Sequence, residues 1–314
     1  MAEFVPANTP PVDEVRAPGM DHAHYRFRTL PEAPRVAWPD GARIAFTVTL
    51  VLDCWELEPP AGASPDPRIV SPLGRFFPDW LTWSQREYGA RVGIFRVLDA
   101  LDRFGLTPSV ALGSAAAQRY PELLDELMQR NACFMAHGSH ATRRITSRMS
   151  EAEERAFIAA ARDAVAAAAG EPPLGWCGQD FNQSALTPAL LAEAGFLYTT
   201  DWPNDDLPYS LGPYDGRRLL ALPPQPEWND LECMWLRRVS PPVWADGIAE
   251  AFAVLHEEGG GVFNLTLHPW IAGQAHRIRY LREALTRVLG KPGVWRATTD
   301  AVAQAVQTQL AAGG

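Results

Sequence analysis

Three side chains suited to proton transfer stand directly after apolar stretches of the sequence. His268 follows the run 262–267, and Asp53 follows the longer run 43–52, with Glu56 three residues further on. An imidazole titrates near neutral pH and a carboxylate can accept a proton, so these residue types are typical of general acid–base chemistry. Polar residues that only end a strand would give the same pattern. The hypothesis therefore depends on whether the fold brings the three together.

Apolar, β-branched stretches alternate with amphipathic ones along the chain, and these elements must position the three side chains. Strands are predicted at 43–52, 107–112, 132–136, 174–178, 197–200, 219–222 and 262–267. Helices are predicted at about 94–104, 120–129, 150–169, 186–195, 245–256 and 280–289, and a last strand–helix pair begins at 294. Such alternation predicts a parallel sheet with right-handed crossovers, and about seven units of it indicate a (β/α) barrel.

Polar clusters follow most of the predicted strands. They lie at 53–56, 137–140, 176–180, 201–206, 227–230 and 268. The C-terminal ends of parallel strands meet on one face of such a fold, so we expect the clusters to form a single site. His137 opens the second cluster, and we expect it beside Asp53 and His268.

Composition limits the classes of partner and compartment. The 314 residues carry a net charge of -9, from 28 basic and 37 acidic residues, which disfavours nucleic acid and anionic membranes. No apolar run approaches the ~20 residues of a membrane span, and the first 20 residues lack a basic stretch followed by an apolar one. The four cysteines form no CxxC pair, which favours reduced thiols. We therefore expect a cytoplasmic protein with a small-molecule substrate.

The domain organisation is predicted to be simple. Residues 1–40 are rich in proline and show little periodicity, so they are interpreted as an extended N-terminal arm. Residues 41–314 contain no linker-like break and no internal repeat, so they are interpreted as a single catalytic domain.

An ordered set of short motifs carries a family resemblance. The motifs are REYGARVG at 86–93, HG at 137–138, PLGW at 173–176, DWPNDDLPY at 201–209, EWND at 227–230, LHP at 267–269 and GQAHR at 273–277. With these motifs the chain resembles the polysaccharide deacetylase (NodB homology) superfamily, in particular its branch of metal-independent allantoinases and cyclic-imide hydrolases. The resemblance implies a distorted (β/α) barrel of the NodB type, hydrolysis of a non-peptide C–N bond and, often, a homo-oligomer.

The resemblance also implies a metal motif, from which this sequence departs. Sugar deacetylases of the superfamily carry adjacent aspartates after the first strand and two histidines four residues apart. Here Cys54 follows Asp53, and Ala141 stands four residues after His137. A tight zinc site needs three protein ligands, and these positions supply two, so no metal or other cofactor is expected. The alternative is a divalent metal such as zinc, with Asp53, His137 and His140 as weak candidate ligands.

The roles expected of the site follow from the chemistry of amide hydrolysis. Asp53 is the first choice for the base that activates water, and Glu56 is the fallback. His268 matches the position that serves as general acid in the superfamily, and His137 is expected to polarise the carbonyl or orient the water. Without a metal, a cyclic ureide or imide is easier to open than an acetamide, because its nitrogen leaves as a better-stabilised species. The expected substrate is a small cyclic amide, imide or ureide. The alternatives are a metal-dependent N-deacetylase of a sugar or small amide, and a non-catalytic binding protein on a degenerate barrel.

Six further residues are candidates for substrate binding. Tryptophans that follow strands can stack on a flat ring, an arginine can make a forked contact with a carbonyl or carboxylate, and aspartates can hold polar groups. The candidates are Trp176, Trp202, Trp270, Arg91, Asp205 and Asp206. For each of them a structural role remains open: packing at the rim, an ion pair with Glu87, or capping of a turn.

Overall fold

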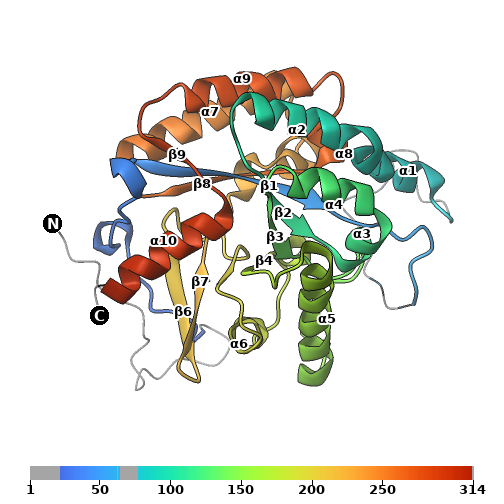
Figure 1. Cartoon of the computed structure of the whole chain (residues 1–314), viewed down its shortest axis with the longest axis horizontal. Helices are drawn as coiled ribbons and strands as arrows, with labels where there is room; N and C mark the ends of the chain where they lie inside the picture. The colour runs from blue at the N-terminus through green and yellow to red at the C-terminus, as the bar shows by residue number, and fades with distance from the viewer. Residues whose placement is uncertain (1–21, 62, 64–76, 313–314) are drawn as a thin grey trace.

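A long buried strand, β1 (Ile44–Leu52), lies between β2 (Ser109–Leu112) and β8 (Val262–Leu267) near one end of the sheet in the computed structural model (Figure 1). The structure describes residues 22–61, 63 and 77–312. Every residue of β1 is buried, as expected for a strand that is covered on both faces. The strand pairs in parallel with β8, with Leu50 opposite Leu267, so the two strands end side by side.

Within the described residues, nine strands form one curled sheet in the order β6-β7-β5-β4-β3-β2-β1-β8, with β9 beside β1. The remaining strands are β3 (Cys133–Ala136), β4 (Gly175–Trp176), β5 (Tyr198–Thr199), β6 (Tyr209–Tyr214), β7 (Arg217–Ala221) and β9 (Val294–Arg296). Only the β6–β7 pairing is antiparallel, so eight strands run parallel, rather than about seven. In this part of the chain no pairing joins β6 to β8, and the sheet forms an open barrel. The predicted distorted (β/α) barrel is confirmed.

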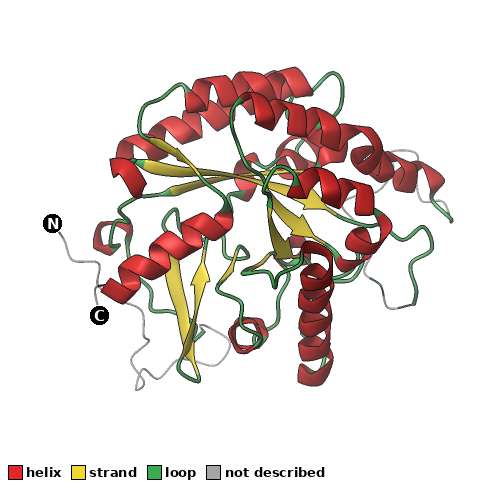
Figure 2. Cartoon of the chain, viewed as in Figure 1, coloured by secondary structure: helices red, strands yellow, loops and turns green. Residues whose placement is uncertain are grey.

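Helices pack against the sheet (Figure 2), most of them on its outer face and the C-terminal helix, α10, on its inner face. They are α1 (Trp80–Tyr88), α2 (Ile94–Arg103), α3 (Ser114–Arg119), α4 (Pro121–Met128), α5 (Glu151–Ala169), α6 (Thr187–Glu193), α7 (Pro241–Glu258), α8 (Pro269–Ala272), α9 (Ile278–Leu289) and α10 (Thr299–Ala312). Short 3-10 or π turns are η1 (Leu30–Glu32), η2 (Pro39–Gly41), η3 (Gly89–Gly93), η4 (Gln179–Phe181), η5 (Pro226–Trp228) and η6 (Leu231–Leu236). In Figure 1, α2, α7 and α9 lie on one side of β1 and β8, and α10 lies on the other.

Two hydrophobic cores separate the two faces of the sheet. Side chains of a strand point alternately to opposite faces, so Phe46, Val48 and Leu50 of β1 join the outer core under the helices. Ala45 points inward, into a smaller core that Val302 of α10 also enters. The inner core therefore fills the N-terminal end of the barrel, and the C-terminal end remains for polar groups.

The inward positions lead directly to the predicted catalytic residues. Continuing every second residue from Ala45 along β1 reaches Asp53, and the same step from Val262 along β8 reaches His268. On β3, Met135 belongs to the inner core, so His137 two residues later has the same parity. The strand period thus directs three residues from separate strands into one end of the barrel.

The described part of the N-terminal region, residues 22–40, lies against the body of the protein. The carbonyl of His24 accepts a hydrogen bond from Gly212 of β6, and Trp38 is buried, with its indole N–H donating to Gly261. The rest of the predicted arm, 1–21, lies outside the described residues, so the arm and the domain boundary at 41 stay predictions. Among the helices that the structure describes, none is long and apolar enough to cross a membrane.

Candidate active site

Asp53 and His137 form a buried pair at the C-terminal ends of β1 and β3. His137 Nε2 lies 3.4 Å from Asp53 Oδ1, and His137 Nδ1 lies 2.5 Å from the carbonyl oxygen of Cys177. Both ring nitrogens thus face acceptors, which favours the doubly protonated imidazolium. Burial lowers the pKa of His137, but the Asp53 charge and both hydrogen bonds outweigh it and hold this pKa well above the usual value.

The carboxylate of Asp53 is held in its ionised form. Burial raises the pKa of Asp53, but the charge of His137 and hydrogen bonds from His137 and Gln179 outweigh it, and the pKa lies below its usual value. The Gln179 amide donates from Nε2 to Asp53 Oδ1 at 2.7 Å and to the His137 carbonyl at 2.9 Å. Asp53 is therefore a fixed anion at neutral pH.

A second histidine–aspartate pair follows β8. His268 Nδ1 lies 2.7 Å from Oδ1 of Asp230, which is fully buried. Asp230 Oδ2 accepts from the backbone N–H groups of His268, at 2.8 Å, and Ala272, at 3.2 Å. Asp230 thus fixes the ring orientation and leaves Nε2 as the His268 ring nitrogen that faces away from it.

One cavity brings these groups together. It opens to solvent at the C-terminal ends of the strands. The polar side chains along its wall include Asp53, His137, Gln179, Asn229, Thr266 and His268. The structure therefore joins three of the four residues predicted to be catalytic.

An aromatic recess adjoins the same residues. Asp53 and His268 also line a smaller cavity together with Trp55, Arg86 and Trp270. The guanidinium of Arg86 lies 4.1 Å from the ring centroid of Trp270 and 5.1 Å from that of Trp55, within range of cation–π attraction. Trp270 is therefore placed beside the site, as predicted for a substrate-binding residue, although its contact with substrate remains a prediction.

Glu56 and Arg91 are not brought to the cavity. Glu56 forms an ion pair with Arg143 at 2.6 Å and accepts a hydrogen bond from Thr142 at 2.5 Å. The Arg91 side chain is 74% exposed and lies 3.9 Å from Glu87. Glu56 therefore binds loop residues instead of facing the cavity. Arg91 makes the ion pair with Glu87 that the sequence analysis named as its alternative role.

Two predicted tryptophans lie away from the cavity for different reasons. Trp176 has the outward parity of β4, so it is buried in the outer core, where it packs on Phe196. Trp202 contacts the rings of His22, His24 and Tyr25 and so anchors the N-terminal segment. The structure does not support stacking of either indole on a ligand in this cavity.

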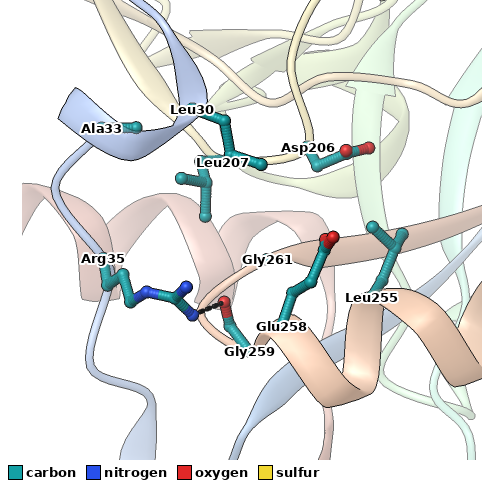
Figure 3. A pocket seen from close by; sticks show the side chains of 9 residues that line it. All are labelled: Leu30, Ala33, Arg35, Asp206, Leu207, Leu255, Glu258, Gly259 and Gly261. Carbon is teal, nitrogen blue, oxygen red and sulfur yellow. Dashed lines mark hydrogen bonds between the residues drawn. The ribbon is translucent and has the colours of Figure 1, made fainter.

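Asp205 and Asp206 lie near the start of β8, whereas His268 follows its end. Asp205 pairs with Arg28 at 3.4 Å, and its Oδ1 accepts from the backbone N–H of Asp206 and Leu207, as in a capped turn. Asp206 lines a separate small pocket with Glu258 and Arg35 (Figure 3). Burial, together with the charges of Asp205 and Glu258, raises the pKa of Asp206. Asp205 thus takes the structural role left open by the sequence, and Asp206 does not line the cavity of Asp53 and His268.

The donor set does not fit a tight metal site. Among the described residues, no group of three or more His, Cys, Asp and Glu side chains is placed to hold a metal ion. His137 directs both nitrogens at protein acceptors, and the neighbour that completes the cluster is the amide of Gln179. Burial lowers the pKa of His140, which follows in the same loop and does not complete a ligand triad.

Sequence reasoning missed the residues that hold the catalytic groups. Asp230 lies 38 residues before His268, and Gln179 lies 126 residues after Asp53, so neither partner is visible from local spacing. Both lie in polar clusters after predicted strands, 227–230 and 176–180. Strand-end position was the available signal, and it identified the clusters without identifying the partner within each.

Comparisons with known proteins agree with this geometry. The sequence matches no protein-family model. A Schizosaccharomyces pombe protein provisionally named polysaccharide deacetylase is 27% identical over 243 residues, 70% of this chain and 74% of that protein.

Two solved structures share the fold over most of the chain. The crystal structure of a Mycobacterium smegmatis protein, again provisionally named polysaccharide deacetylase, superposes with a TM-score of 0.75 at 27% identity, covering 88% of this chain and 94% of that one. PuuE allantoinase superposes with a TM-score of 0.76 at 24% identity, again covering 88% and 94%. The last likeness is one of fold.

Proposed function

Because the chain shares the fold and the ordered motifs of the polysaccharide deacetylase (NodB homology) superfamily, with an allantoinase-like branch among its neighbours, we propose that it opens a small cyclic amide, imide or ureide. It is a hydrolase of non-peptide C–N bonds. The observation that carries the narrower proposal is the cavity in which Asp53 and His268, each with its own buried partner, face the same space.

Asp53 acts as the base. Its carboxylate is ionised at neutral pH and belongs to the cavity wall, so it can accept a proton from a water molecule that attacks the substrate carbonyl. The positive charge of His137, held beside it, stabilises negative charge that develops on the carbonyl oxygen. An imidazolium thus supplies positive charge at the position to which the family resemblance assigns a metal in sugar deacetylases.

His268 acts as the acid. Its Nδ1 is bound to Asp230, so Nε2 is the atom that can donate a proton to the departing ring nitrogen. The steps balance as the addition of one water across one C–N bond: the water oxygen bonds to the carbonyl carbon, and the ring nitrogen leaves with a proton. The product is an open-chain amine, amide or urea, from a cyclic amide, imide or ureide respectively, that carries a new carboxyl group.

The cavity also supports a small cyclic substrate over an acetylated polymer. The reacting groups are partly buried in the cavity wall, and Asp53 and His268 also line the adjoining aromatic recess. A cyclic imide or ureide expels a better-stabilised nitrogen than an acetamide does, so it depends less on a metal Lewis acid. A homo-oligomer in the cytoplasm belongs to the same proposal, and the mass in solution and cell fractionation check it.

The test is a hydrolysis screen with matched variants. Wild type, Asp53→Asn and His268→Ala are assayed on allantoin, hydantoin, succinimide, glutarimide and N-acetylglucosamine, and the purified protein is analysed for metal. We expect ring opening by the wild type and its loss in both variants. Deacetylation of the sugar by a protein with one tightly bound zinc would establish the metal-dependent alternative. Binding without turnover of any compound would establish the non-catalytic one.

A further inference from the structure

Gln179 presents one unused hydrogen-bonding atom to the cavity. The side-chain amide has a forced orientation, because one end lies between two acceptors, Asp53 Oδ1 at 2.7 Å and the His137 carbonyl at 2.9 Å. Only the NH₂ group can occupy that place, since an oxygen there would face two other oxygens. The other end of the amide, Oε1, must therefore point away from this pair.

The side-chain oxygen of Gln179, Oε1, is available to a ligand. The side chain is 6% exposed and belongs to the cavity wall. Among the residues that the structure describes, no donor reaches Oε1, and every interaction of Gln179 is accounted for by its amide nitrogen and its backbone. Oε1 is not among the buried side-chain atoms that lack a partner, so it is open to the cavity. An acceptor that a ligand cuts off from water is costly without a partner, so a ligand that fills the cavity must supply a donor to this atom.

The loop around Gln179 is held in a strained shape that fixes this atom. Asp180 and Phe181, the next two residues, both adopt left-handed backbone conformations, with φ of 52° and 56°. Such conformations are unfavourable for residues other than glycine and persist only where the surroundings impose them. Here Asp180 pairs with Arg144 at 2.7 Å, and the Gly178 N–H donates to Asp201 at 2.7 Å.

A close approach on the other side fixes the same loop. A Cβ added to Gly178 would lie 2.8 Å from Asp201 Oδ2, so the contact with Asp201 requires glycine at this position. The two strained residues and the glycine contact together hold the Gln179 backbone, and with it the position of the amide.

We propose that Oε1 of Gln179 accepts the N–H of the substrate ring, so that the substrates are cyclic amides, imides or ureides with an unsubstituted N–H beside the scissile carbonyl. The inference rests on the proposed function. A neutral amide oxygen is suited to this role because, unlike Asp53, it does not take the proton from the group it recognises. N-methylation removes the donor and leaves Oε1 buried without a partner.

The expected discrimination is large, because a site built to bind a substrate N–H rejects an analogue that lacks it. We expect the wild type to prefer succinimide over N-methylsuccinimide, and hydantoin over 3-methylhydantoin, in which the methyl group is on the nitrogen between the two carbonyls, by at least about 10²-fold in kcat/KM. Taking the ratio within one protein cancels any change in the activity of Asp53.

Two variants of similar size separate the two ends of the amide. Gln179→Met removes both the donor to Asp53 and the acceptor for the ring, so the preference for the N–H ring falls below about tenfold. Gln179→Glu removes the donor and keeps an acceptor, so the preference persists. The added carboxyl raises the pKa of Asp53, and the acid limb of the pH–rate profile moves to higher pH.

Calorimetric titration of the wild type and Gln179→Met with both rings keeps the inference separate from the proposed function. If the wild type opens no ring, the proposed function fails. Tighter binding of the N–H ring that is lost in Gln179→Met would then still support the role of Gln179. Equal preference ratios in the wild type and Gln179→Met, in turnover or in binding, would overturn it, as would the absence of ring binding.

Discussion

The two histidine–aspartate pairs of the cavity differ in which member is the more deeply buried. In the first pair the histidine is the buried member: the His137 side chain is 4% exposed and the Asp53 side chain is 16% exposed. In the second pair the aspartate is buried completely, whereas the His268 side chain is 13% exposed. Two pairs with the same composition therefore present different members to the substrate.

The difference assigns the roles. Where the histidine is buried between two acceptors, it is a fixed cation that keeps its partner ionised, and the carboxylate is available as a base. Where the aspartate is buried with three N–H donors, it holds its partner in one orientation, and the imidazole is available as an acid. Environments that separate the tasks of similar groups are characteristic of acid–base sites.

Replacing Asp53 or His268, the member of each pair that acts on the substrate, should lower the activity most. We expect Asp53→Asn and His268→Ala each to lower kcat/KM by about 10²- to 10⁴-fold, the usual contribution of a general base or acid. Steady-state kinetics on the ring that the wild type opens fastest gives the measurement. A loss below tenfold for either variant would contradict the role given to that residue.

Removing the supporting anion should have a smaller effect. Asp230→Asn keeps the size of the side chain but no longer favours a proton on Nδ1 of His268, so we expect kcat to fall by about 10- to 10³-fold, with little change in KM. The same loss as in His268→Ala would instead make Asp230 as essential as the acid itself.

The first pair should leave a signature in the pH dependence of stability. The folded pKa of Asp53 is below its ordinary 3.8, so its contribution is complete above pH 3.8 and is lost as the pH falls through the folded value. The folded pKa of His137 is well above its ordinary 6.5, so its contribution is complete below pH 6.5 and is lost as the pH rises through the folded value. The stabilisation is therefore complete between pH 3.8 and 6.5.

Asp53→Asn tests that coupling. The charge of Asp53 is the main reason that the pKa of His137 is raised against the effect of burial, so the variant lowers this pKa. Titration of the His137 ring by NMR measures the change, and Tm across the pH range compares the two proteins. An unchanged His137 titration would show that the pair is not coupled in the way described.

A third carboxylate serves as the control with the smallest expected effect. Glu56 is close in sequence to Asp53, but its oxygens are bound by Arg143 and Thr142, and it lies outside the cavity wall. We expect Glu56→Gln to change kcat/KM by less than about threefold, as for a residue with no part in proton transfer. A loss comparable to that of Asp53→Asn would restore Glu56 as a candidate base.

The residues predicted most accurately are those that the strand period controls. Asp53, His137 and His268 follow inward-facing positions of β1, β3 and β8, and apolar strands of known parity carry this information in the sequence. The same rule explains the failure at Trp176, which has outward parity on β4. Parity was available from the sequence and was not applied there.

The partners could not be predicted because their positions depend on the paths of loops. Asp230 and Gln179 meet His268 and Asp53 only after the chain has left one strand and returned to another. Near Arg91, a π turn follows α1, and it is Arg86, five residues earlier, that points inward to the tryptophans. Long-range contacts of this kind leave no local spacing in the sequence.

The most direct test of the roles given to Asp53 and His268 is how the loss of activity in each variant depends on the leaving nitrogen of the substrate. Wild type, Asp53→Asn and His268→Ala are compared on rings of graded nitrogen acidity, from a cyclic ureide to a more acidic imide. If His268 is the acid, its loss matters less as the nitrogen becomes easier to expel, whereas the defect of Asp53→Asn stays constant along the series. Defects that vary in parallel for the two variants would contradict the division of roles.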